Sequence, residues 1–426
     1  MNPSSLATIA ARDLAWWRRV PNGLIVIGGL LALAGALLDL KQFGYAWLLA
    51  FMFFLSLSLG ALFLVLVHHL FDAGWSVAIR RFCEHLACLL FPWLALLFVP
   101  VACLAASIYP WMQVANPQTD PALSAKYPLF TRPMFYGVAG ACFGVWWVLS
   151  RGLRKWSLRQ DDTGSAQCTF KMRTYAGWGI AAFAITLTLA AIMWMKALQH
   201  QWFSTLYGAC YFAGSVWLSV ATAYLLTLLL ARQGVLRPVL HEHQFYFLGL
   251  LMFAFTVFYA YIHFSQYFII WNANLPEETF WYVAREQGSW YYVGLFIIFG
   301  HFFVPFLALL RLDVKVSCAI MTPVCLWAWL LHYVDLAFNI MPVAHPAGFP
   351  WRWLWLDLGC LAFMAGVLAK VFVNDLLRSP AYPLKDPRLR EAMGLEHPVP
   401  TQISGGELDE TEGFADGAPR TNGGAT

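Results

Sequence analysis

The sequence is dominated by long apolar stretches, each close to the length that crosses a lipid bilayer as a helix. A transmembrane helix needs about 20 mostly apolar residues, and ten stretches of the 426-residue chain meet that requirement. Backbone N–H and C=O groups cannot stay unpaired in lipid, so such stretches must be helical. The sequence therefore predicts an all-α polytopic membrane protein with spans near 22–40, 45–70, 86–109, 133–150, 175–196, 204–231, 245–271, 289–310, 316–340 and 351–375.

The composition excludes a soluble globular protein and argues against several kinds of redox site. Hydrophobic residues make up 60% of the chain and charged residues only 12%, whereas soluble proteins are about one quarter charged. The nine cysteines are scattered without a CxxC or CxxCH pair, which argues against zinc, an iron–sulfur cluster or covalently attached haem. We therefore expect no metal site, no iron–sulfur cluster and no c-type haem in this chain, and the sequence offers no candidate catalytic residues.

The basic residues predict the orientation of the spans. If the ten spans alternate, one side of the membrane collects 20 of the 27 Lys and Arg residues, including the stretch "RGLRKWSLRQ". Basic loops stay on the cytoplasmic side, so both termini are predicted to be cytoplasmic. The first apolar run lacks a small-residue cleavage site and is expected to remain as a span. The Gly-rich, acidic tail after about residue 400 is expected to be disordered.

Five titratable side chains interrupt the apolar spans of the C-terminal half. Ionisable residues are costly at membrane depth and normally face the bundle interior or water. At about 1.5 Å of rise per residue, all five fall at compatible depths on four consecutive spans. Histidine exchanges protons near neutral pH, and a neighbouring carboxylate can orient its ring. We therefore predict a proton pathway formed by His263, His301, His332, Asp335 and Asp357.

A second set of polar residues accompanies these five. The sixth span carries a polar stripe at helical spacing, Tyr211, Ser215, Ser219 and Thr222, while Tyr259 and Asn339 share helix faces with His263 and Asp335. Toward the cytoplasm, His68 and Asp72 lie one turn apart, and Lys370 lies near the inner end of the last span.

Simpler interpretations of these polar residues stay open. Any one of the buried histidines could form an ordinary helix–helix hydrogen bond, and the cytoplasmic group could consist of solvated charges and a lysine that reaches out of the membrane. Two histidines on facing helices could also ligate b-type haem, although haem-binding bundles carry paired histidines more regularly.

Four stretches carry a resemblance to a known family. They are "AFMFFLSLSLGALFLVLVHHLFDAGWSVAIRRFCEHLA", "HFSQYFIIWNANLPEETFWYVAREQGSWYYVG", "RLDVKV" and "SPAYPLKDPRLREAM". Together with the ten-span layout they resemble the F subunit of bacterial alternative complex III, a quinol:cytochrome c oxidoreductase. That subunit is related to the polysulfide-reductase C (NrfD-like) membrane subunits. The likeness covers residues 15–395 or so, and NLPEET and YPLKDPRL are its most specific parts.

The resemblance implies two four-helix bundles flanked by the first and tenth helices. The expected segments are a cytoplasmic N-terminal segment 1–21, a first flanking helix 22–40, a first bundle 45–196, a second bundle 204–340, a second flanking helix 351–375 and a cytoplasmic tail 376–426.

The resemblance also implies a bacterial inner-membrane location and partner subunits. The partners would be a multihaem cytochrome c, an iron–sulfur subunit, the homologous C membrane subunit and, in some assemblies, a terminal oxidase. In the family, haem and iron–sulfur clusters belong to these partners, and the C subunit is the better-supported site of quinol oxidation. The F subunit is thought to offer a route for protons, and a quinone contact by it stays open.

Three functions therefore stand beside one another. The leading one is a membrane subunit of a respiratory quinol:electron-acceptor oxidoreductase, without its own redox centre, that carries protons or contacts quinone. The alternative is a secondary transporter, but the Gly and Pro breaks do not fall at matched positions of two halves, as inverted repeats would require. The third is a purely structural anchor in the bilayer. Nothing in the sequence indicates nucleic-acid binding.

Overall fold

The computed structural model describes residues 15–115 and 119–394. Throughout these residues the secondary structure is helical, without a strand. Ten helices are long and apolar enough to cross a membrane, which confirms the predicted all-α polytopic fold. Their bounds are Arg19–Leu38, Leu40–Leu70, Val77–Cys103, Arg132–Thr163, Ala166–Trp194, Tyr207–Arg232, Glu242–Ala273, Gly288–Leu309, Cys318–Val343 and Trp351–Arg378.

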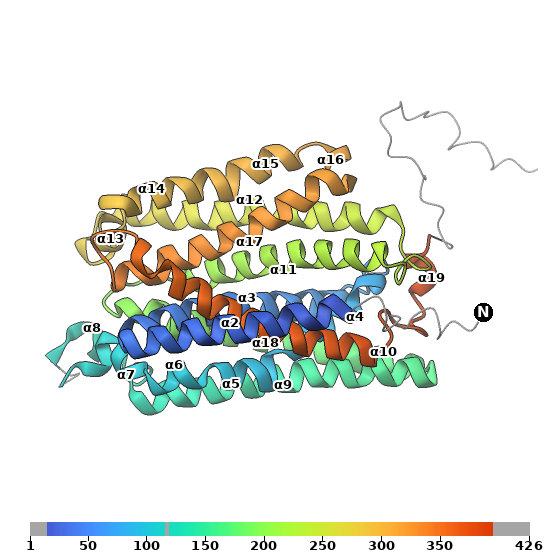
Figure 1. Ribbon diagram of the computed structural model, residues 1–426, viewed down its shortest axis with the longest axis horizontal. Helices are drawn as coiled ribbons and strands as arrows, with labels where there is room; N and C mark the ends of the chain where they lie inside the picture. Colours follow the sequence, from blue (N-terminus) through green and yellow to red (C-terminus); the bar gives the residue numbers. More distant parts are fainter. Residues whose placement is uncertain (1–14, 116–118, 395–426) are drawn as a thin grey trace, which may run out of the picture.

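The spans pack as two groups of four helices with a flanking pair (Figure 1). The first group comprises α3 (Leu40–Leu70), the broken span that begins with α4 (Val77–Cys88), α9 (Arg132–Thr163) and α10 (Ala166–Trp194). The second comprises α11 (Tyr207–Arg232), α12 (Glu242–Ala273), a span made of α14 (Gly288–Ile297), η5 (Ile298–Phe303) and α15 (Val304–Leu309), and α17 (Cys318–Ile340). The flanking pair is α2 (Ala15–Leu38) and α18 (Leu354–Arg378).

Helices α3 and α11 meet where the two groups join. Both are apolar around most of their circumference, and both are almost entirely buried, as expected of helices surrounded by other helices. Their backbones approach closely at Gly60, where a Cβ atom would lie 2.2 Å from the carbonyl oxygen of Ser215. Glycine is therefore required there. Two α11 side chains also bond to α3 carbonyls, since Tyr211 donates to Met52 at 2.8 Å and Ser219 donates to Leu57 at 2.7 Å.

Several helices extend beyond the predicted spans. Helix α4 begins at Val77 and α9 continues to Thr163, so the expected loops 71–85 and 151–174 are largely helical. Burial of paired charges explains the difference, because Arg81 of α4 pairs with Asp161 of α9. The outer connections expected at 110–132 and 272–288 contain the short helices α8 (Pro121–Ser124) and α13 (Pro276–Val283).

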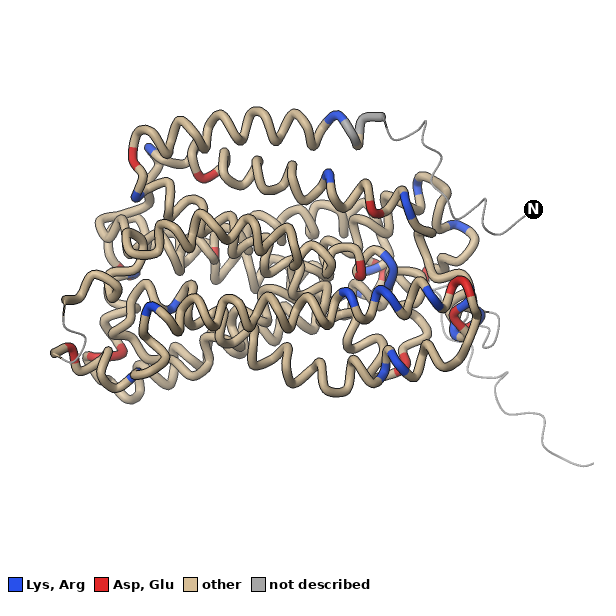
Figure 2. Tube along the Cα trace, turned by 90° about the horizontal axis from the view of Figure 1, so that it is seen from below, with Lys and Arg blue, Asp and Glu red and all other residues tan. Residues whose placement is uncertain are grey.

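Most of the described Lys and Arg residues lie toward one end of the bundle, which we call the basic end (Figure 2). The ten spans bring the chain back to the side from which it started. The segment 379–393, which includes α19 (Leu389–Ala392), folds over this end. The basic end is the one predicted to face the cytoplasm.

A network of buried ion pairs holds segment 379–393 in place. Arg80 donates to Asp386 at 2.5 Å, and Arg388 donates to both oxygens of Asp386 at 2.9 and 3.0 Å. Arg388 also donates to Asp72 at 2.8 Å. Burial would raise the pKa of the Asp386 carboxyl, but the guanidinium groups of Arg80 and Arg388 outweigh burial and hold that pKa well below its usual range. The YPLKDPRL stretch is therefore a structural clamp on the ends of α3, α4 and α9.

Candidate functional site

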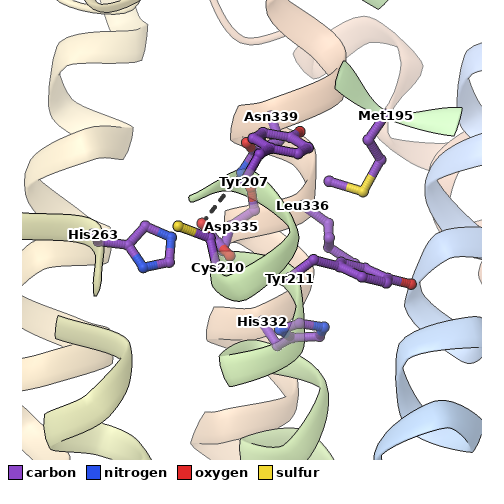
Figure 3. Close-up of a pocket in the computed structure, with 9 residues that line it drawn as sticks. All are labelled: Met195, Tyr207, Cys210, Tyr211, His263, His332, Asp335, Leu336 and Asn339. Atoms are coloured by element: carbon purple, nitrogen blue, oxygen red, sulfur yellow. Dashed lines mark hydrogen bonds between the residues drawn. The ribbon is translucent and has the colours of Figure 1, made fainter. Parts of the chain in front are cut away.

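A small cavity of about 20 Å³ lies in the second helix group, in the half remote from the basic end. That volume is large enough to hold a water molecule. Figure 3 shows side chains from α11, α12 and α17 around it. Its lining consists of Met195, Tyr207, Cys210, Tyr211, His263, His332, Asp335, Leu336 and Asn339. Three of the five predicted pathway residues therefore share one polar cavity.

Asp335 and Asn339 form the part of the site contributed by the end of α17. Asp335 is only 8% exposed. The Asn339 amide donates to the Asp335 carbonyl at 2.8 Å and lies 3.4 Å from carboxyl Oδ1, and its own oxygen accepts from the Tyr207 hydroxyl at 3.2 Å. The spacing of four residues places both side chains on one face, as predicted. This arrangement fixes the Asn339 amide and turns the Asp335 carboxyl toward the cavity (Figure 3).

His332 closes the cavity on the side of α3. Its Nε2 lies 2.8 Å from the Ser56 hydroxyl, and that hydroxyl donates to the Phe53 carbonyl at 2.7 Å. Since the serine proton is used by the carbonyl, Nε2–H of His332 must be the donor to Ser56. The neutral ring then carries its lone pair on Nδ1, which has no hydrogen-bond partner among the described residues. His332 can therefore accept a proton at Nδ1.

Three further aromatic rings connect His263 to the interior of the group. His263 bonds through Nδ1 to the Tyr259 carbonyl at 2.9 Å, and its ring stacks on Tyr259 with centroids 3.8 Å apart. Tyr259 stacks in turn on His301 at 3.5 Å, and His301 stacks on Trp217 at 3.9 Å. Both ring nitrogens of the fully buried His301 lack a partner among the described residues. His301 lies in η5, a π-helical segment, and such segments frequently occur at functional sites.

The structure separates Asp357 from the other four. Asp357 is buried on α18, whose main packing partners are α2 and α3, and it does not line the small cavity. The expectation that five groups face one interior is thus wrong for this residue. The sequence positions gave comparable depths, but depth does not determine which side of the bundle a flanking helix occupies.

The secondary polar set mostly forms ordinary hydrogen bonds. Ser215 donates to the Tyr211 carbonyl at 2.6 Å within α11. Ser219 belongs to the α3–α11 contact, and Thr222 accepts from the Trp329 indole at 3.0 Å. Tyr259 differs from these, because its buried hydroxyl makes no regular hydrogen bond with any of the described residues.

The residues predicted near the cytoplasm belong to the clamp at the basic end. His68 lies 2.7 Å from the Ser76 hydroxyl and 3.2 Å from Arg80, and Asp72 pairs with Arg173 and Arg388. Lys370 is exposed on α18 and lies apart from these contacts.

An apolar stretch of α3 separates the small cavity from the basic end. Ser56 and His68 are twelve residues apart in α3, or roughly 18 Å along its axis. The side chains at Leu59, Leu62, Val65 and Leu66 between them are buried and apolar.

Sequence reasoning missed several residues of the site. Ser56 and Ser58 interrupt the apolar run "FLSLSLG", which is a weak signal for a polar contact inside α3. Arg285 lies in a connection that was predicted at the membrane surface, yet it is only 2% exposed. Its guanidinium donates to Phe338, Asn339, Trp281 and Gln199, so it ties the end of α17 to the α13 region.

The variant Gly214→Ala tests whether the position of the His332 ring contributes to the stability of the protein. A Cβ atom at residue 214 would lie 2.8 Å from Cε1 and 2.9 Å from Nδ1 of His332, so Gly214→Ala must push the ring away from Ser56. We expect a loss of about 1–3 kcal/mol of stability, measured as a lower thermal midpoint in detergent. Gly140→Ala on α9, where nothing lies within 4 Å, is the control and should not lower the midpoint. Equal midpoints for the two variants would show that the ring moves freely.

No group of three or more His, Cys, Asp or Glu side chains in the part of the chain that the structure describes could hold a metal ion. No protein-family model and no curated protein matches the chain at a significant level.

Proposed function

We propose that the chain is the membrane subunit of a bacterial respiratory quinol:electron-acceptor oxidoreductase, in the bacterial inner membrane with its basic end toward the cytoplasm. We propose further that its second helix group carries protons between the outer surface and the bundle interior. The single observation that supports this is the cavity shared by His263, His332 and Asp335. The ten-span architecture and the resemblance of four stretches to the F subunit of alternative complex III support the membership of the complex.

The proposed pathway leads from the outer surface to three side chains that can gain or lose a proton, His263, Asp335 and His332. At the outer end, the Gln266 amide is held in place, because it accepts from Ser204 at 2.7 Å and donates to the Tyr282 hydroxyl at 3.0 Å. A proton from the outer side moves past this amide to the Asp335 carboxyl or to Nε2 of His263. A water in the cavity then passes it to Nδ1 of His332. His263 and Asp335 line the same cavity, and an imidazole and a carboxyl group can each accept and donate a proton.

The pathway covers one half of the membrane. Residues 59–67 of α3, between Ser58 and His68, are all apolar, and Leu59, Leu62, Val65 and Leu66 among them are buried. We propose that this apolar stretch stops proton movement unless water enters. The subunit therefore exchanges protons with the outer side and stores or releases them in the interior, while the buried clamp charges at the basic end serve structure.

Purification of the tagged chain from its native membrane tests the assignment to a complex. We expect it to come out with haem-bearing and iron–sulfur partners, detected by optical spectra and mass spectrometry. A chain that is stable and monodisperse without such partners, and that supports substrate uptake in proteoliposomes, would instead be a secondary transporter.

A further inference from the structure

Two lysine side chains lie together at the outer end of the bundle, the end remote from the basic end. Lys126 follows the short helix α8, and Lys196 begins the 3-10 turn η4 (Lys196–Gln199) after α10. Their ammonium nitrogens lie 4.1 and 5.9 Å from the ring centroid of Phe203. Fewer Lys and Arg residues lie at this end than at the basic end (Figure 2), as expected for loops on the outer side of a membrane. A pair of neighbouring lysines is therefore unexpected there.

Lys196 is a buried cation without an acceptor. The residue is only 8% exposed, and its ammonium group forms no hydrogen bond or ion pair with any residue that the structure describes. Burial, and then the charge of Lys126, lower the pKa of the Lys196 amine to about 8. A charged group in such surroundings is costly unless an opposite charge compensates it. The position of Lys196 therefore indicates an anion that the described chain does not supply.

Lys126 has a hydrogen-bond donor to share with that anion. Its ammonium group donates to the carbonyl oxygens of His200 and Trp202, the second at 3.4 Å. An ammonium group carries three N–H donors, so one of them stays free. Burial lowers the pKa of Lys126 to about 8 as well, although the charge of Asp120 opposes this effect. An anion between the two amines would stabilise the charged form of both.

Asp120, whose charge acts on Lys126, is committed to other partners. Its Oδ2 lies 2.8 Å from Nε2 of His200. Its Oδ1 accepts from the backbone N–H groups of Ala122 and Leu123, at 2.9 and 3.3 Å. Both carboxylate oxygens thus cap α8 and hold His200, and among the described residues neither oxygen bonds to a lysine.

The depth of the two lysines in the membrane indicates the kind of anion. Lys196 lies two residues after Trp194, where the span Ala166–Trp194 ends. Phe203 and Tyr127, the residue after Lys126, are exposed aromatic side chains, which are typical of the level of the lipid head groups. A phospholipid brings a phosphate group to this level and places its acyl chains along the neighbouring span. Lysine is a common ligand of phosphate.

We propose that Lys126 and Lys196 bind the phosphate of an anionic phospholipid of the outer leaflet, with the head group beside Phe203. Two cations without a free carboxylate favour a lipid of net negative charge, such as phosphatidylglycerol. Phosphatidylcholine fits less well, because its choline group would add a third cation. The site lies beside the first helix group, so it does not depend on the proton pathway proposed for the second group.

Thermal unfolding with added lipid tests the site on the full chain, purified in detergent with the subunits that accompany it. Phosphatidylglycerol should raise the thermal midpoint of the wild type by several degrees more than phosphatidylcholine does, because a ligand of the folded state stabilises it. Lys196→Gln and Lys126→Gln should lose at least half of this difference. Lys41→Gln is the matched control, since Lys41 is an exposed lysine at the outer end of α3, and it should keep the full difference.

The midpoint without phosphatidylglycerol separates lipid binding from a structural role of Lys196. Lys196→Gln removes an uncompensated charge, so its midpoint in phosphatidylcholine should equal or exceed that of the wild type. A lysine needed for folding would instead give a lower midpoint with both lipids, and that result would contradict the proposal.

Two further measurements identify the source of the anion. Inorganic phosphate at the concentration used for phosphatidylglycerol should produce no comparable shift, since it brings no acyl chains. Carbodiimide, which joins an amine directly to a carboxylate, should not link Lys196 to another subunit. The lipid assignment is overturned by a full phosphatidylglycerol effect in Lys196→Gln, by an equal shift with inorganic phosphate, or by a carbodiimide link from Lys196 to an acidic side chain of a partner.

Discussion

Replacing Asp335 by asparagine is expected to lower proton-coupled turnover of the assembled complex at least tenfold. The substitution preserves size and the contact with Asn339 but removes the one carboxyl that the described residues contribute to the small cavity. General acid–base groups typically contribute factors of about 10²–10⁴ to proton transfer. Quinol-driven electron transfer and the accompanying proton release are measured together on the complex in proteoliposomes.

Asp357→Asn is the matched control for this prediction. Both carboxyls are buried and lie in membrane spans, but Asp357 is on α18 and does not line the small cavity. We therefore expect normal proton release in Asp357→Asn. Equal losses in both variants would indicate a general effect of removing a buried charge, and normal turnover in Asp335→Asn would remove the pathway assignment.

The variant His332→Leu distinguishes a proton pathway from a purely structural role as a membrane anchor. This variant loses the Nδ1 acceptor and the bond to Ser56 but keeps an apolar side chain in the packed interior. A structural anchor would show unchanged turnover and an unchanged ratio of protons to electrons. The pathway instead requires a lower proton ratio while haem and iron–sulfur subunits still co-purify.

The spans could be predicted from the sequence because a helix needs about 20 mostly apolar residues to cross the lipid bilayer. Their ends could not, since α4 and α9 continue as helices through Arg80, Arg81 and Asp161. Charged residues usually mark the end of a span. Here they neutralise one another across neighbouring helices and stay buried, and a partner distant in sequence is invisible to a pattern of hydropathy.

The candidate site could be predicted only in part, because a sequence indicates the helix face and the depth of a residue but not its neighbours on other helices. Helical spacing placed Asp335 and Asn339 on one face, and depth brought His263 and His332 to the same level. Depth could not show that Asp357 lies on a helix outside the second group.

Asp386→Asn is expected to destabilise the protein more than any other conservative change at the basic end. Asp386 compensates two buried guanidinium groups, and Arg80 is only 2% exposed. Removing one partner of a buried pair costs about 3–5 kcal/mol, because the remaining charge stays in an apolar surrounding. We expect a thermal midpoint several degrees lower in detergent and faster proteolysis after residue 378, where the clamp segment begins.

An exposed ion pair provides the control for Asp386→Asn, and the lowered pKa of Asp386 predicts how the effect depends on pH. Asp313→Asn removes an exposed partner of Arg311 and should leave the midpoint unchanged. Because the pKa of Asp386 is lowered in the folded state, its contribution is fully present above the ordinary aspartate pKa of about 4 and is lost as the pH falls through the lowered value. The difference between wild type and Asp386→Asn should therefore be constant from pH 8 to about pH 5 and shrink below about pH 4. A difference that already disappears near neutral pH would mean that Asp386 is not the counter-ion of Arg80.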